Sequence, residues 1–337
     1  MTEEERAPWA PLEPESGAAP AAEPSPPGQP LPPPSGQPWA APPPPGAPPW
    51  ATSYAAQPKA GDYRTGPLPL HPMTLSDILD GAFKLLKANW RTVLLITAVF
   101  VVPLHIVSAF IQRNLYGGHS FFDAVNNPAL TSDTSGNARL AVTGSVALIS
   151  LLVTPFVAGA ISKVVAASYL GGEETVGSAL RATGRRAWAL FAAWVVVHIL
   201  ESIGFVLCIL PGLIVMATFV SVAPAIVIED LGPIRGLRRS ARLMWPRLFS
   251  VMGVAVVSGL LASVVGNALG TVPTVAAFAI GFKYGWPLLA AGSILSALIT
   301  TPFVAIVATL IYFDGRIRQE GFDLELMADD LARRSPT

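Results

Sequence analysis

A short basic amphipathic stretch followed by two apolar runs occurs three times after residue 72, and this repeat restricts the chain to one class of fold. The stretches begin at Met73 (MTLSDILDGAFKLLKANW), Thr175 (TVGSALRATGRRAW) and Leu231 (LGPIRGLRRSARLMW). Each leads into a run long enough to cross the hydrocarbon core of a bilayer, which takes about 20 apolar residues in a helix. The sequence therefore predicts an all-α integral membrane protein.

Six segments have the length and apolar character of transmembrane helices. They are residues 92–111, 140–165, 187–207, 209–228, 248–269 and 286–313. Only 13% of the residues are charged, about half the share in a soluble domain, so lipid must cover much of the surface. Interior prolines predict local kinks at Pro103, Pro155, Pro224 and Pro302. Pro211 with Gly212 predicts a tight turn, and Cys208 reads as a small packed hydrophobe.

Lysine and arginine lie mostly on one side of these spans, and this asymmetry predicts the orientation. The connections on the other side contain only Arg113, Arg139 and Lys283. We expect a multi-pass protein of a bacterial plasma membrane with both termini in the cytoplasm. The three basic stretches are expected to form interfacial amphipathic helices on the inner leaflet, with Trp90, Trp188 and Trp245 at the junctions.

Three regions follow from composition. Residues 1–72 hold 22 of the 33 prolines and lack the features of a secretory signal peptide, so we expect a disordered cytoplasmic tail. Residues 73–326 form the expected six-helix domain, and residues 327–337 a short cytoplasmic tail. P-x-x-P spacings in the long tail fit cytoplasmic protein partners, although at this proline density a spacer role is the simpler interpretation.

Charge gives two further expectations about partners. Acidic and basic residues balance at 22 each, which gives no indication of nucleic-acid binding. The third basic stretch places four arginines around much of its predicted helix, and these are candidate contacts for anionic lipids: Arg235, Arg238, Arg239 and Arg242. Ordinary anchoring of the cytoplasmic side explains the same residues and is the favoured interpretation.

Ionisable residues inside a membrane span need a reason, because burying them is costly. His198 and Glu201 lie three residues apart on the third span and share a helix face. His105 on the first span has a similar depth, so the three residues form one candidate polar cluster if spans one and three are neighbours. Such a cluster could relay protons or bind a polar ligand, but hydrogen bonding between helices is the favoured interpretation. Asn267 on the fifth span has a weaker claim.

A second repeat lies inside two spans. The sequence T-P-F-V-A occurs at residues 154–158 in span two and at residues 301–305 in span six. Units of two spans each share one orientation, so an axis along the membrane normal would relate them. The middle unit has no copy, and duplication is suggested without being established.

Motifs of soluble enzymes are absent from the sequence. It contains no phosphate-binding glycine loop, nucleophile elbow or zinc-protease helix motif, and its one cysteine excludes an internal disulfide. Glu229, Asp230 and Asp314 lie on the expected cytoplasmic side, where nearby arginines are the simpler partners. We expect no enzymatic activity, no cofactor and no metal.

Three stretches resemble the membrane domain that accompanies glycerophosphoryl diester phosphodiesterases and occurs in many actinobacterial proteins of unknown function. They are MTLSDILDGAFKLLKANW, IEDLGPIRGLRRSARLMWPRLF and TPFVAIVATLIYFDGRIRQEGFDLEL. The resemblance implies a six-helix module without an established activity. It does not imply hydrolysis, because no histidine stands in the H-R-G motif of the catalytic barrel, and residues 314–337 are far fewer than the roughly 250 of such a barrel.

The sequence thus predicts a non-enzymatic membrane scaffold or accessory protein for lipid or membrane-protein processes, with the proline-rich tail recruiting partners. The alternative is a permease or lipid transporter that uses His105, His198 and Glu201. The oligomeric state stays open.

Overall fold

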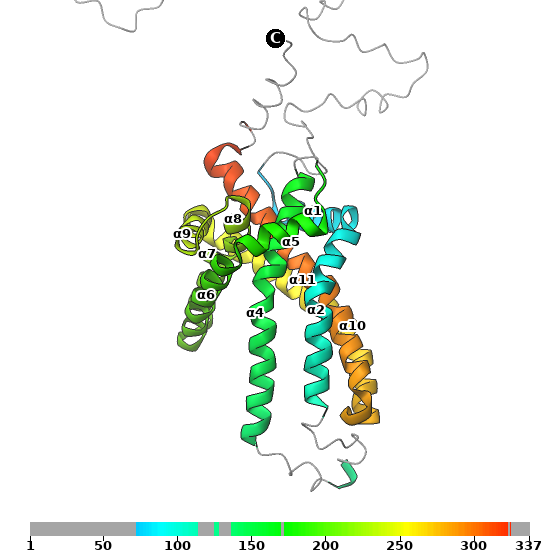
Figure 1. The fold of residues 1–337 in the computed structure, drawn as a ribbon. Coiled ribbons are helices and arrows are strands. Elements are labelled where there is room, and N and C mark those ends of the chain that lie inside the picture. Colours follow the sequence, from blue (N-terminus) through cyan, green and yellow to red (C-terminus); the bar gives the residue numbers. More distant parts are fainter. Residues whose placement is uncertain (1–71, 114–124, 128–135, 170–171, 323, 325–337) are drawn as a thin grey trace, which may run out of the picture. The chain divides into compact units, whose positions relative to one another are not determined.

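The computed structural model describes residues 72–113, 125–127, 136–169, 172–322 and 324. The regular elements of this part are all helical (Figure 1). In chain order the named helices are α1 (Leu75–Ala88), α2 (Trp90–Gln112), α4 (Gly136–Tyr169), α5 (Val176–Arg185), α6 (Ala187–Leu207), α7 (Ile209–Phe219), α8 (Val222–Ile228), α9 (Pro233–Met244), the 3-10 turn η2 (Trp245–Arg247), α10 (Leu248–Ile280) and α11 (Phe282–Glu320). They all belong to the unit Pro58–Thr337, and the expected tails at 1–72 and 327–337 lie almost entirely outside the described residues.

Five helical segments within the described residues are long and apolar enough to cross a membrane. They are Trp90–Ile111, Ala187–Leu207, Ile209–Ile228, Pro233–Ile280 and Lys283–Glu320. The predicted second span falls inside α4, in which Val153–Tyr169 is a shorter apolar segment. The expectation of an all-helical protein with several membrane-length helices is therefore confirmed.

Helices form where the three basic stretches predict them, because each has its own start signal. Thr74 and Thr175 are N-caps whose side chains accept hydrogen bonds from the backbone N–H of Asp77 and Ser178, and the two caps complete reciprocal capping boxes. α9 begins with Pro233, whose fixed φ suits the first helical position. Each of these helices precedes one of the long helices, with the turn η2 between α9 and α10.

The turn between α6 and α7 differs from the prediction. The chain reverses direction at Cys208, which is extended at φ −174° and exposed. Pro211 and Gly212 lie instead in the first turn of α7. A Cβ on Gly204 would lie 2.8 Å from the backbone nitrogen of Gly212, so the two glycines allow the helices to approach closely. Cys208 is thus not a packed hydrophobe, and the glycines serve helix contact.

The predicted fourth span is interrupted between α7 and α8, at Val220 and Ser221. Pro224 explains the interruption, because it lacks an N–H and its ring would clash with the Val220 carbonyl in a continuous helix. Ser240 of α9 compensates: its hydroxyl donates to the Thr218 carbonyl at 2.8 Å and lies 2.9 Å from the Ser221 hydroxyl. The break is therefore stabilised by a helix from the next unit of the repeat. The other three interior prolines lie within continuous helices.

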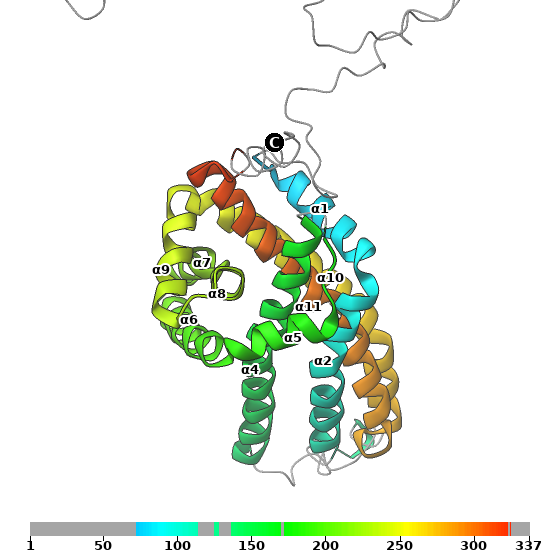
Figure 2. The ribbon, with the colours of Figure 1, turned by 45° about the horizontal axis from the view of Figure 1, so that its top comes forward.

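Most of the largest fully buried side chains lie in the second halves of α4 and α11 and on the helices packed there, which are α5 and α8 against α4 and α1 and α9 against α11. Tyr169 of α4 stacks on Phe313 of α11 with ring centroids 4.6 Å apart, and Met73, Leu243 and Met244 are buried around them. The far ends are more exposed, as at Val206 of α6 and Val272 of α10. In Figures 1 and 2, α4 lies between α2 and α6. This arrangement leaves the halves of the long helices that lie away from the core free to line a cavity.

Candidate functional site

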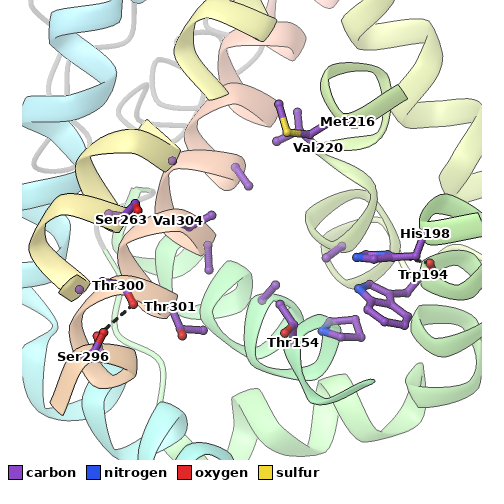
Figure 3. Close-up of a pocket in the computed structure, with 18 of the residues that line it drawn as sticks. Thr154, Trp194, His198, Met216, Val220, Ser263, Ser296, Thr300, Thr301 and Val304 are labelled. Atoms are coloured by element: carbon purple, nitrogen blue, oxygen red, sulfur yellow. Dashed lines mark hydrogen bonds between the residues drawn. The ribbon is translucent and has the colours of Figure 1, made fainter. Parts of the chain in front are cut away.

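A cavity of about 840 Å³ lies among helices α4, α6, α7, α8, α10 and α11, and we call it the groove. Figure 3 shows side chains from several helices directed toward it, among them Thr154, Trp194, Met216 and Thr301. Its volume falls in the range of about 300–1,000 Å³ that small-molecule sites occupy. The groove is therefore the principal candidate site in the described part of the chain.

Both copies of T-P-F-V-A line this groove. Thr154, Pro155 and Ala158 contribute from α4, and Thr301 with Ala305 contributes from α11. Two segments that the sequence marked as repeats thus meet at one site.

His198 and Glu201 of α6 both line the groove. His198 Nε2 is 3.7 Å from a carboxylate oxygen of Glu201, which is beyond direct hydrogen-bond distance. His198 Nδ1 lies 3.1 Å from the Trp194 carbonyl, and the imidazole stacks on the Trp194 indole with centroids 3.8 Å apart. Stacking and hydrogen bond together hold the imidazole in place beside the carboxylate.

His105 does not join this pair. The predicted cluster required spans one and three to be neighbours, but α4 separates α2 from α6 in both views (Figures 1 and 2). His105 lies on α2, which packs on α11 and α4, and it is not among the residues that line the groove. The structure therefore reduces the predicted cluster of three residues to His198 and Glu201.

α10 and α11 add a polar wall that the sequence interpretation missed, apart from Asn267. Ser263, Asn267 and Thr271 follow one another at intervals of four on α10, and Ser296 and Thr300 line the groove from α11. Asn267 Nδ2 donates to the Ser263 carbonyl at 2.7 Å, and Thr300 donates to the Ser296 carbonyl at 2.9 Å. The interval of four within an apolar span was the signal that could have identified this face.

A second set of polar contacts lies outside the groove, around Glu229 at the end of α8. Glu229 accepts hydrogen bonds from Arg239 at 2.7 Å and from the Tyr312 hydroxyl at 2.5 Å. Arg239 also pairs with Glu320, and Arg316 reaches Glu320 at 3.2 Å. The hydrogen bond from Arg239 lowers the pKa of Glu320 below its usual value. These contacts join α8, α9 and α11.

Asp314 is a buried carboxylate at the point where the described chain begins. It accepts a hydrogen bond from the Met73 backbone N–H at 2.8 Å and pairs with Arg247 and, at 2.9 Å, with Arg318. Arg318 also donates to the Met73 carbonyl at 2.9 Å. Asp230, at φ 57° after the end of α8, pairs with Arg186. Glu229, Asp230 and Asp314 therefore all have arginine partners, as the sequence suggested.

The four candidate lipid-binding arginines separate into two groups. Arg239 is directed inward, with 16% of its side chain exposed, and pairs with Glu229 and Glu320. It is therefore not available as a lipid contact. Arg235, Arg238 and Arg242 are exposed and lie at intervals of three and four, on one face of α9. Beside them Ile234 is 70% exposed. Helical phase, which places Arg239 next to buried Ser240 and Gly236, accounts for the difference.

No set of three or more His, Cys, Asp or Glu side chains in the described residues is arranged to hold a metal ion. A family model described as a domain of unknown function (DUF7847) matches residues 187–312, from the first residue of α6 to Tyr312 of α11. No curated protein and no solved structure matches the chain. The matched range includes His198, Glu201 and the polar wall of α10 and α11.

Proposed function

We propose that this chain is a six-span plasma-membrane protein that binds a small apolar or amphipathic molecule in the groove, as a carrier or lipid-accessory protein without chemical turnover. The observation that carries the proposal is the cavity of about 840 Å³ between helices, several of which are long and apolar enough to cross a membrane. Its lining combines apolar side chains such as Met216, Val220 and Val304 with a few hydroxyl and amide groups. That combination is typical of sites for small ligands.

The six spans of the proposal are α2, α4, α6, α7 with α8, α10 and the part of α11 up to Phe313, so that Arg316, Arg318 and Glu320 lie beyond the membrane. Their basic ends are assigned to the cytoplasm, so both termini are cytoplasmic and α1, α5 and α9 lie along the inner leaflet. Trp90, Trp188 and Trp245 support this placement, because they are 51%, 75% and 64% exposed at the junctions where indole rings favour the interface.

Binding of anionic lipid to α9 belongs to the same proposal. Arg235, Arg238 and Arg242 form an exposed basic face, and each charge near an anionic leaflet contributes about 1 kcal/mol. This contact would anchor α9, which in turn stabilises the break between α7 and α8 through Ser240. Lipid binding at the surface and the geometry of the groove are thereby connected.

The resemblance to the phosphodiesterase-associated membrane domain also remains a proposal. The three stretches that carry the resemblance lie together in the structure, since Met73 of the first and Arg247 of the second both contact Asp314 of the third. A recruiting role for residues 1–72 stays a prediction, because those residues lie almost wholly outside the described part.

The groove is tested by photolabelling. Full-length protein in nanodiscs is exposed to a diazirine-bearing hexadecanol, and labelled peptides are identified by mass spectrometry. Val304→Trp places a bulky indole in the groove from a side chain that is 42% exposed. Leu295→Trp is its control, because Leu295 lies on the same helix, is 45% exposed and does not line the groove. We expect Val304→Trp alone to reduce labelling of groove peptides at least fivefold. Equal labelling in the two variants would reject the groove as a binding site.

A further inference from the structure

The ionisable side chains that line the groove restrict what can bind in it. Among the described residues that line it, Glu201 and His198 are the only ionisable ones, and no lysine or arginine is among them. The basic face of α9 and the paired arginines around Glu229 and Asp314 lie elsewhere on the described chain. An anionic ligand group would meet a carboxylate there without any cation to offset it.

The hydrogen bond of His198 determines what its other nitrogen offers. Because the Trp194 carbonyl can only accept, His198 Nδ1 carries the proton and donates to it at 3.1 Å. In the neutral imidazole Nε2 is then an acceptor. It faces the Glu201 carboxylate oxygen, also an acceptor, at 3.7 Å. Two acceptors so placed are satisfied together by one donor group that lies between them.

Trp194 adds an aromatic surface at the same point. Its indole lies under the His198 imidazole at the edge of the groove (Figure 3). Trp is the best of the aromatic side chains at attracting a cation, and the attraction strengthens in a site shielded from water. Carboxylate, imidazole acceptor and indole together favour a positively charged N–H donor.

We propose that the groove selects an amphiphile with a protonated amine head, which binds between His198 Nε2 and Glu201 beside Trp194, while its apolar part lies along Val220 and Val304. This inference rests on the proposed function, because it names the class of ligand for the same groove. It is a binding step only, and no bond is made or broken.

The test uses three photoreactive probes with the same 16-carbon chain and a different head: hexadecylamine, hexadecanol and hexadecyl phosphate. Full-length protein in nanodiscs of uncharged and zwitterionic lipid is labelled at increasing probe concentration, and labelling of groove peptides is normalised to that of peptides from the lipid-facing surface. We expect the amine to half-saturate the groove at a concentration at least tenfold lower than the phosphate. The alcohol should fall between them.

Two substitutions test the residues. Glu201→Gln should raise the half-saturating concentration of the amine about tenfold and thereby remove most of the difference between the amine and the phosphate. Trp194→Phe should weaken amine binding severalfold while it retains an aromatic ring against His198. Glu173→Gln, an exposed carboxylate outside the groove, is the matched control and should change neither value. Size-exclusion profile and melting temperature confirm that each variant is folded.

The outcomes separate the two proposals. Alcohol labelling that depends on Val304 would show that the groove binds ligand. If the amine and the phosphate then half-saturate at equal concentration, or if Glu201→Gln leaves amine binding unchanged, the amine selectivity alone is rejected. If no probe labels the groove and Val304→Trp has no effect, the proposed function itself is rejected.

Discussion

Ser162 and Thr309 occupy the same position in the two copies of the repeat, eight residues after Thr154 and Thr301, and their hydroxyls lie 3.0 Å apart across the contact of α4 with α11. Each hydroxyl also lies within hydrogen-bond distance of the carbonyl four residues earlier, at 2.7 and 2.8 Å. Those carbonyls belong to Ala158 and Ala305, which are again equivalent positions of the repeat. The two copies therefore meet through like residues, as expected when an axis relates two repeated units.

The hydroxyl pair should contribute a measurable coupling to stability. We predict that Ser162→Ala and Thr309→Val each destabilise the protein, and that a double-mutant cycle gives a coupling energy of about 0.6 kcal/mol, the average for hydrogen bonds between membrane helices. Unfolding in mixed micelles with increasing SDS measures it. Ser202→Ala, at an exposed position of α6, is the control and should have no effect. Strict additivity of the two changes would show that the hydrogen bond contributes nothing.

Substitution of the buried Asp314 should lower the free energy of unfolding strongly. Asp314→Asn retains an oxygen for the Met73 N–H but removes the charge that balances Arg247 and Arg318. We expect a loss of roughly 3 kcal/mol in the free energy of unfolding, because removing the charge of a mostly buried carboxylate leaves its arginine partners without a counter-charge.

The same SDS titration measures the Asp314 variant, and limited proteolysis near Met73 reports whether the start of the described chain is released. Asp80→Asn is the matched control, since Asp80 pairs with Lys84 while 64% of its side chain is exposed. An exposed pair of this kind is worth little. Similar stability of the two variants would contradict the role assigned to Asp314.

Glu320 should make stability depend on pH in the acid range. Arg239 holds the pKa of this carboxyl below its ordinary value of 4.5, so the folded state binds the proton less readily than the unfolded state. The contribution is fully present above pH 4.5 and is lost as the pH falls through the lowered folded-state pKa. We predict that the wild-type protein loses more stability than Glu320→Gln between about pH 5 and about pH 3.

Melting temperature measured at several pH values tests the Glu320 prediction, with Glu173→Gln as a control at an exposed carboxylate. The difference between wild type and Glu320→Gln isolates this group from other carboxylates that titrate in the same range. Parallel curves for the two proteins would contradict it.

Cys208 provides a direct test of orientation, because it is the one cysteine of the chain and is exposed at the turn between α6 and α7. With both termini in the cytoplasm, this turn lies on the outer side of the membrane. We predict that a membrane-impermeant maleimide labels intact cells expressing the protein. Cys208→Ser should abolish the signal. Labelling that requires permeabilised cells would reverse the proposed orientation.

Local chemistry accounts for what the sequence predicted correctly. Membrane-length helices follow from uninterrupted apolar runs, and α1, α5 and α9 follow from capping residues and helical spacing next to those runs. Arginine partners for Glu229, Asp230 and Asp314 followed from composition on one side of the spans. The proximity of His198 to Glu201 required only that one helix form, since the two residues lie three apart.

Contacts between distant segments decided the rest. The sequence could not show that α4 separates His105 from His198, that Arg239 is directed inward, or that Ser240 bonds the carbonyl freed where α7 ends. Each of these depends on which helix faces which, and that is set by packing of small residues such as Gly159, Gly266 and Gly315 against partners about 30 to 70 residues away in the sequence. By itself the sequence determined that the chain forms membrane helices, because length and apolarity act within each segment. Only the tertiary structure decided where the groove lies, because a cavity exists only between helices.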